Sequence, residues 1–166
     1  MSPHTEFDKG SLIWVKSEIE ETLSRAREAM LQFAEGGGES SLRHAQTHLH
    51  QAAGALTMVD LAGLARFCEE LEQAAAQLIR IENAPDSVPL LLRGLEAVRV
   101  YLDRLMAGMP NTPLLLKPLF AEIARLRQGE TSGAELFFPN LQLDLPQGLP
   151  QKRWPDGELK DELLRQ

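Results

Sequence analysis

The sequence predicts an all-α protein: an antiparallel four-helix bundle followed by a fifth, kinked helix and an extended C-terminal tail. Four long segments repeat apolar residues at alternating steps of three and four, the spacing that lines one face of a helix. Short connections between these segments favour antiparallel neighbours. No segment alternates apolar and polar residues with a period of two, so we predict no strand.

The first helix is predicted from Leu12 to Ala34. Its apolar face consists of Leu12, Val15, Ile19, Leu23, Ala26, Met30 and Phe33. The three glycines at positions 36–38 should end it, because consecutive glycines carry too much backbone freedom to stay helical.

The second helix should be capped by Ser40 or Ser41 and run to Leu56 or Val59. Its inner stripe consists of Leu42, Ala45, Leu49, Ala52, Ala53 and Leu56. On a helical wheel His50 falls about 110° from the centre of that stripe, so we expect it on an exposed flank. Gly54 lies one turn further on the same side and should leave open space beside the imidazole.

The third helix is predicted from about Leu61 to Ile81, with Asp60 as its N-cap. The hairpin between the second and third helices should therefore turn near residues 58–61. The sequence Asn-Ala-Pro at positions 83–85 should separate the third helix from the fourth.

The fourth helix should be capped by Asp86 or Ser87 and end at Gly108. A fifth helix follows, with Thr112 as its cap and Pro113 in its first turn. Pro118 lacks the N–H of an interior helical bond, which predicts a kink or two pieces, the main one over about 118–127. These elements place the bundle at residues 10–129.

Residues 130–166 are predicted to form a C-terminal tail that leads into further domains of a longer protein. Leu136, Phe137, Phe138 and Leu141 should pack this tail back onto the bundle, because two adjacent exposed phenylalanines would form an unfavourable apolar patch.

The composition excludes several classes of protein. The chain has 17 Lys and Arg against 24 Asp and Glu, a net charge of −7, which argues against nucleic-acid binding. A single cysteine, Cys68, excludes an internal disulfide, and its apolar surroundings predict a buried thiol. No apolar run is long enough to span a bilayer. The first ten residues lack the pattern of a signal peptide, so we expect a cytoplasmic protein.

The stretch HQAAGALTMVDLAGLARFCEELE, residues 50–72, resembles the signature of histidine-phosphotransfer (Hpt) domains. The matching positions are His50, Gly54, Leu64, Phe67, Leu71 and Glu72. Two positions depart from the pattern: Ala53 stands where the family has Lys, and Asp60 where it has a turn Gly. The resemblance implies a four-helix Hpt-like bundle with His50 at the phospho-acceptor position.

A wider resemblance covers roughly residues 14–146. The segments WVKSEIEETL, KPLFAEIARLRQGE and ELFFPNLQ flank that signature. In this order they are similar to the N-terminal region of chemotaxis-type hybrid histidine kinases of type IV pilus systems (the ChpA/PilL type) and their scaffold relative FimL. This implies a bacterial protein of twitching-motility signalling. The chain contains no sequence resembling the ATP-binding domain of a kinase.

Two functions follow from the Hpt resemblance. One is a docking or scaffold domain with impaired phosphotransfer, which would bind a response-regulator receiver domain or a polar hub protein through His50, Gln51 and Gly54. The other is an active phosphotransfer domain with His50 as phospho-acceptor in a hybrid-kinase phosphorelay. Ala53 favours the first, because the cation of the family Lys would steady the transferred phosphate.

The sequence places other charged groups near the same site. Arg66 is a candidate replacement cation beyond the turn, whereas Glu69, Glu70 and Glu72 would add negative charge that opposes phosphate. His44 and His48 are four residues apart on one helix, but no third ligand is near in sequence, so we predict no metal site. The sequence contains no cofactor motif and no nucleophile–base pair, and it leaves the oligomeric state open.

Overall fold

The structure is a computed structural model that describes residues 9–81 and 84–127, and all of its regular elements are helical. The elements are α1 (Lys9–Ala34), α2 (Gly38–Met58), α3 (Ala62–Leu78), α4 (Ala84–Met106), the 3₁₀ helix η1 (Pro113–Leu116) and α5 (Lys117–Arg125). The prediction of an all-α bundle is confirmed, and no strand occurs in these two ranges.

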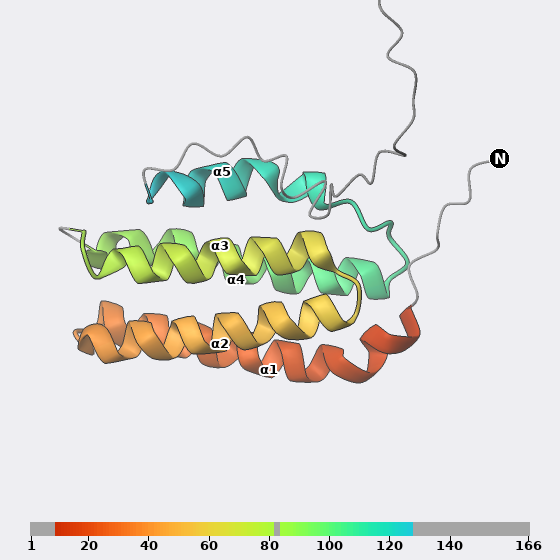
Figure 1. The fold of residues 1–166 in the computed structure, drawn as a ribbon, viewed down its shortest axis with the longest axis horizontal. Helices are drawn as coiled ribbons and strands as arrows, with labels where there is room; N and C mark the ends of the chain where they lie inside the picture. The colour runs from red at the N-terminus through yellow and green to blue at the C-terminus, as the bar shows by residue number, and fades with distance from the viewer. Residues whose placement is uncertain (1–8, 82–83, 128–166) are drawn as a thin grey trace, which may run out of the picture.

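The first four helices form an antiparallel bundle, in which α1 packs against α2 and α4, and α3 packs against α2 and α4 (Figure 1). Helix α5 is an additional layer on α3 and α4, on the side away from α1 and α2. This arrangement leaves α2 and α3 side by side, and α3 therefore contacts α2 along one side and α5 along another.

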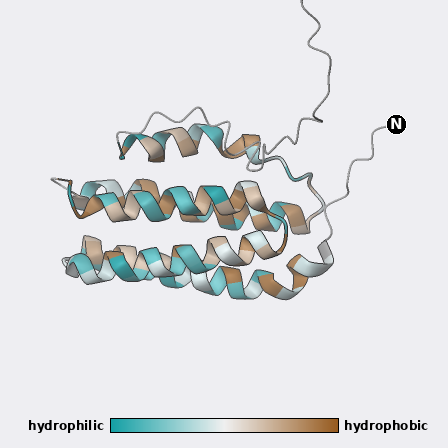
Figure 2. Ribbon diagram, viewed as in Figure 1, coloured by the Kyte–Doolittle hydropathy of each residue, from teal (hydrophilic) through white to brown (hydrophobic). Residues whose placement is uncertain are grey.

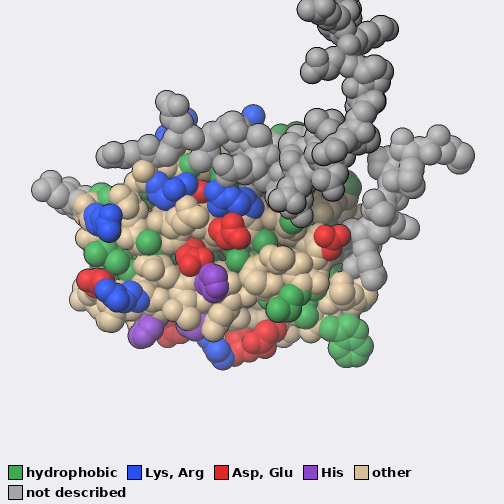
Figure 3. Space-filling view, viewed as in Figure 1, with side chains coloured by type: hydrophobic (Ala, Val, Ile, Leu, Met, Phe, Trp, Pro, Cys, Tyr) green, Lys and Arg blue, Asp and Glu red, His purple; other side chains and the backbone are tan. Residues whose placement is uncertain are grey.

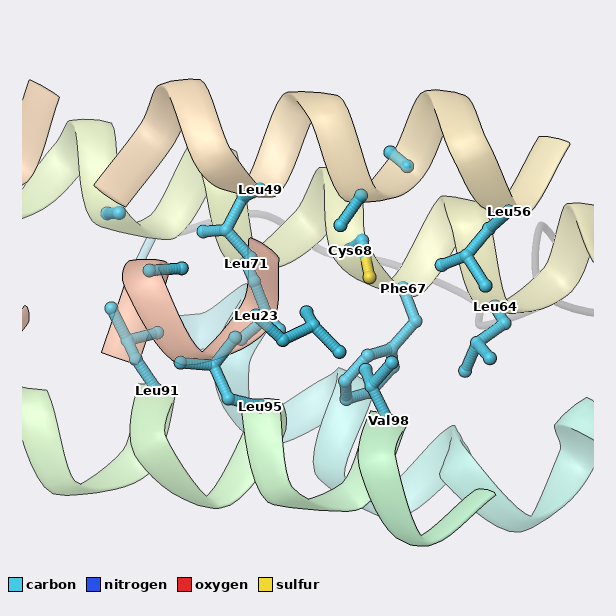
Figure 4. Close-up of a cluster of buried hydrophobic side chains, with 14 of the residues drawn as sticks. Leu23, Leu49, Leu56, Leu64, Phe67, Cys68, Leu71, Leu91, Leu95 and Val98 are labelled. Carbon is cyan, nitrogen blue, oxygen red and sulfur yellow. The ribbon is translucent and has the colours of Figure 1, made fainter. Parts of the chain in front are cut away.

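The core lies where the apolar stripes of the four helices meet. Each helix carries hydrophilic and hydrophobic residues together, as amphipathic helices do (Figure 2). In the close-up, Leu49 and Leu56 of α2 point toward Phe67 and Leu71 of α3 (Figure 4). Cys68 is fully buried in the same cluster, and burial raises the pKa of its thiol to about 12, so it is a structural apolar residue as predicted.

Helices α1, α2 and α4 end with the same pair of backbone bonds. Each terminal residue with positive φ donates its N–H three residues back, and the following residue donates five residues back, which is the Schellman motif. The residues with positive φ are Gly36 (100°), Asp60 (61°) and Gly108 (91°). At the α2 end, Asp60 N–H bonds the Thr57 carbonyl at 3.2 Å and Leu61 N–H bonds the Leu56 carbonyl at 3.0 Å.

The prediction that Asp60 caps α3 is therefore wrong. Leu61 occupies the N-cap position and no side-chain bond caps the helix, because Asp60 is used to terminate α2 instead. The hairpin nevertheless turns between Met58 and Ala62, where it was predicted. Asp tolerates the left-handed conformation better than most residues, which explains how it fills the position of the family's turn glycine.

Two further predicted caps are wrong. Helix α2 begins at Gly38, and its first turn contains both serines; Ser41 Oγ donates to the Gly37 carbonyl at 3.1 Å. Helix α4 begins at Ala84, so Asp86 lies in the first turn. Pro85 is accepted there because the first N–H groups of a helix have no intrahelical partner. Helix α3 ends at Leu78, three residues before the predicted end.

The predicted fifth helix consists of two pieces, η1 and α5, as its proline suggested. The boundary lies at Lys117, and Pro118 sits in the first turn of α5, where its missing N–H removes no bond. Thr112 precedes η1 but makes no side-chain cap bond. The predicted tail, residues 130–166, lies outside the described residues, and its packing stays a prediction. None of the described helices has the length and apolar character needed to cross a membrane.

Candidate functional site

His50 projects from the outer flank of α2 beside α3, as the helical wheel predicted. Its neighbours Leu49 and Ala52 are fully buried, whereas the His50 side chain is 78% exposed. The space-filling view shows histidine side chains on the face formed by α2 and α3 (Figure 3). The imidazole is therefore open to a second molecule approaching this face.

Glu72 of α3 holds one nitrogen of this imidazole. The antiparallel packing of α2 and α3 brings its Oε2 to 3.3 Å from His50 Nδ1. A carboxylate can only accept a hydrogen bond, so Nδ1 must carry the hydrogen in this contact. In a neutral imidazole the lone pair is then on Nε2. The contact with Glu72 therefore favours the tautomer in which Nε2 is the nucleophile.

A shallow hollow of about 400 Å³ lies around His50; it is called here the His50 hollow. It is lined by Arg43, Gln46, Thr47, His50, Gln51 and Glu72. Gln51 is bound to a neighbour on its own helix, with Oε1 3.3 Å from His48 Nδ1. One turn beyond His50, a Cβ added to Gly54 would meet no atom within 4 Å. The predicted open space beside the imidazole is therefore present.

The position of the family Lys faces inward. Ala53 is only 4% exposed and belongs to the buried side of α2. A lysine there would have to extend its stem past the neighbouring side chains before its ammonium reached solvent. The substitution by Ala53 thus removes a cation and leaves a small apolar residue in the core.

Arg66 does not replace that cation. Its guanidinium lies 3.3 Å from Glu70 and 3.7 Å from Glu69, and its Cζ is 5.6 Å from the ring centroid of Phe120 on α5. Arg66 therefore belongs to the contact between α3 and α5. Sequence reasoning missed Arg43, which lines the His50 hollow and donates from Nε to Glu39 at 3.0 Å. Its signal was the seven-residue spacing from His50, two helical turns along one face.

The three glutamates of α3 have different surroundings. Glu70 is fully buried and accepts two bonds from Arg127, at 2.7 and 3.0 Å. Glu69 lies beside Arg66 at 48% exposure. Only Glu72, at 29% exposure, contacts His50. The expected negative charge beside His50 thus comes from one carboxylate. Within the described ranges, no three His, Cys, Asp or Glu side chains are grouped to hold a metal ion.

Comparison of the sequence with known proteins shows the family of the chain. The family model of the Hpt domain matches residues 11–107, which include α2, α3, α4 and most of α1. The chain is similar to the scaffold protein FimL of Pseudomonas aeruginosa, with 32% identity over 139 residues. That match covers 82% of this chain and 25% of FimL, so the chain spans about a quarter of this relative. No solved structure matches the chain significantly.

Proposed function

The chain belongs to the Hpt domain family, and from that premise we propose that it is a docking domain of bacterial two-component signalling with impaired phosphotransfer through His50. The pathway we propose is the chemotaxis-type signalling that controls type IV pili and twitching motility, in the cytoplasm. The similarity to a scaffold protein supports this assignment. The observation that carries it is the chemistry around His50: an exposed imidazole contacted by a carboxylate, with Ala53 at the Lys position.

Transfer to His50 would begin with attack of the Nε2 lone pair on the phosphorus of a receiver's aspartyl phosphate. The P–N bond forms as the P–O bond to the aspartate breaks, and that electron pair returns to the aspartate carboxylate. The Nδ1 hydrogen stays in place, and Glu72 stabilises the imidazolium that results. The contact between α2 and α3 therefore orients the His50 imidazole and makes its Nε2 nucleophilic.

What the site lacks is a cation that compensates the charge of the phosphoryl group. A cation beside it in a partly screened site is worth about 1 kcal/mol or more, which corresponds to roughly a fivefold change in rate or equilibrium. Ala53 supplies no cation, and Glu72 places a negative charge near the same ring. Docking depends instead on shape, and His50, Gln51 and the bare backbone at Gly54 form an accessible surface for a receiver domain.

The test separates docking from transfer. Binding of a receiver domain of a type IV pilus system is measured by calorimetry for the parent chain and for His50→Gln, and transfer is measured with the ³²P-labelled receiver. We expect both chains to bind with dissociation constants within about twofold, and labelling of the parent to be slow. Ala53→Lys should raise the labelling rate of the parent. Rapid, stoichiometric labelling that disappears in His50→Gln would overturn the impaired assignment.

A second candidate, active phosphotransfer with His50 as phospho-acceptor, is favoured by one observation: Arg43 lines the same hollow as His50. Arg43 and Glu39 form an exposed ion pair, which contributes little to stability. Arg43 could therefore release Glu39 and bind a phosphate at little cost in free energy. In this case Arg43→Gln should slow labelling at least fivefold, whereas Arg25→Gln on α1, which removes a similar exposed pair with Glu21, should not. Equal labelling rates in both variants would remove the support for Arg43.

A further inference from the structure

We propose that residues 134–145, which follow α5 in the chain, bind in cis along the outer side of η1 and α5. The starting observation is a pair of adjacent exposed leucines on η1. Leu114 and Leu115 are 51% and 56% exposed, whereas the next residue, Leu116, is buried. Adjacent exposed apolar side chains offer a surface on which another apolar segment could be buried. This inference does not depend on the proposed function.

The outer layer, formed by η1 and α5, has one side that packs on the bundle and one side that faces solvent. Helix α5 packs its inner face, with Phe120, Ile123 and Ala124, onto α3 and α4. It lies on the side of the bundle away from α1 and α2 (Figure 1). The charged residues of α5 are Lys117 and Arg125, both exposed, and Glu122, which pairs with Arg93 of α4 at 3.2 Å. Because Arg93 compensates the charge of Glu122, the surface formed by η1 and α5 is apolar at η1 and has an excess of positive charge along α5.

The point where the chain leaves this layer is fixed. Arg127, two residues after α5, makes two hydrogen bonds to the buried carboxylate of Glu70. The chain therefore leaves at the end of α5 that lies opposite η1. Residues 113–125 extend about 22 Å as a 3₁₀ turn and an α-helix. Nine residues in extended conformation cover about 30 Å, so Leu136 can reach η1 from Arg127.

The composition of the segment matches this surface. It contains Leu136, Phe137, Phe138 and Leu141, which are apolar residues suited to the exposed leucines. Between residues 128 and 146 there are three acidic residues, Glu130, Glu135 and Asp144, and no Lys or Arg. Residues 134–145, which are acidic and apolar, therefore complement the positively charged and apolar surface of η1 and α5. Binding there leaves the His50 hollow uncovered, since that hollow lies between α2 and α3.

The test uses the full chain and its single cysteine. Because Cys68 is fully buried, a nitroxide label reacts selectively with a cysteine introduced as Asn140→Cys. Paramagnetic broadening of backbone amide signals is then recorded by NMR. We expect the signals of residues 113–119 to lose at least half their intensity and those of residues 9–20 and 43–54 to keep theirs. The same label in the Phe137→Ser/Phe138→Ser chain should restore the signals of residues 113–119.

The alternative occupants give different results. Broadening that appears when a labelled chain is mixed with an isotopically enriched, unlabelled chain means that a second copy supplies the segment, and it overturns binding in cis. Broadening centred on the exposed pair Ile13 and Trp14 of α1 overturns the choice of surface. Uniformly weak broadening, unchanged by the two serine substitutions, overturns the proposal as a whole.

Discussion

Two glutamates of α3, separated by one residue, have opposite surroundings. Glu70 is fully buried and is bound by Arg127 and Arg66, whereas Glu72 is partly exposed and pairs with His50. They project about 160° apart around the helix, so one faces α5 and the other faces α2. The same residue type thus holds the outer helix on one side and orients the candidate phospho-acceptor on the other.

The difference lies in how each charge is compensated. A carboxylate removed from water requires cations, and the two arginines supply them to Glu70. Glu72 keeps contact with solvent and therefore needs no such partner. Its charge remains available to His50 Nδ1. Burial and pairing indicate an architectural role for Glu70, and exposure beside a histidine indicates a chemical role for Glu72.

The largest effect is expected from Glu70→Ala. It leaves Arg127 and Arg66 beside a cavity without their carboxylate, which should lower the free energy of unfolding by about 2–3 kcal/mol. This is less than a fully buried pair would lose, because both arginines keep some contact with water. Urea unfolding followed by circular dichroism measures the loss.

The matched control is Glu72→Ala. Its side chain is partly exposed, so unfolding should change by no more than about 0.5 kcal/mol. Labelling of His50 should slow in this variant, because the loss of the group that orients Nδ1 and stabilises the imidazolium should outweigh the loss of its repulsion of the phosphate. Equal destabilisation by the two substitutions would contradict the assignment of different roles to the two glutamates.

Two glycines allow the same comparison between a residue of the core, Gly94, and a residue beside His50, Gly54. A Cβ at Gly94 of α4 would lie 2.5 Å from Leu71 Cδ2 and 3.1 Å from Ile123 Cδ1, where α3, α4 and α5 meet. Gly94→Ala should therefore destabilise the fold by about 1–2 kcal/mol through overpacking. Gly54→Ala meets open space and should stabilise the helix by about 0.5–1 kcal/mol.

The effects of the two substitutions on receiver binding should be the reverse of their effects on stability. Gly54→Ala fills the space beside His50 and should weaken binding although the protein is more stable, whereas Gly94→Ala, remote from that face, should leave binding unchanged. Calorimetric titration together with thermal unfolding of both variants gives the comparison. Unchanged binding in Gly54→Ala and in the bulkier Gly54→Leu would remove Gly54 from the docking surface.

The smallest effect is expected from Asp60→Gly. Asp60 has a φ of 61°, which strains an L-residue, and glycine adopts this conformation freely. Because glycine also increases the entropy of the unfolded chain, the net stabilisation should be only about 0.5 kcal/mol. A shift in the urea midpoint without a change in slope measures it. Destabilisation instead would mean that the Asp60 side chain itself supports the turn.

The apolar periodicity of the sequence determined most of the fold. Helices α1 and α2 bury the stripes that their spacing predicted, with Val15 and Phe33 of α1 only partly buried, because a residue's angle around its own helix follows from its position alone. For the same reason the exposed flank position of His50 and the open side at Gly54 were predictable. The ends of helices were less so: Ser41 and Asp60 are good N-cap types, yet the structure uses them inside a first turn and in a left-handed C-terminal position.

Contacts between helices were decided only by the tertiary structure. The sequence placed Glu69, Glu70 and Glu72 in one acidic group and left Arg66 unplaced. In the structure α3 packs between α2 and α5. On the α5 side Glu70 binds Arg127 and Arg66 lies over Phe120, and on the α2 side Glu72 contacts His50. A helical wheel gives the direction of a side chain, but the partner depends on how two helices are aligned along their axes. That alignment is set by the packing of the whole core, which no local pattern contains.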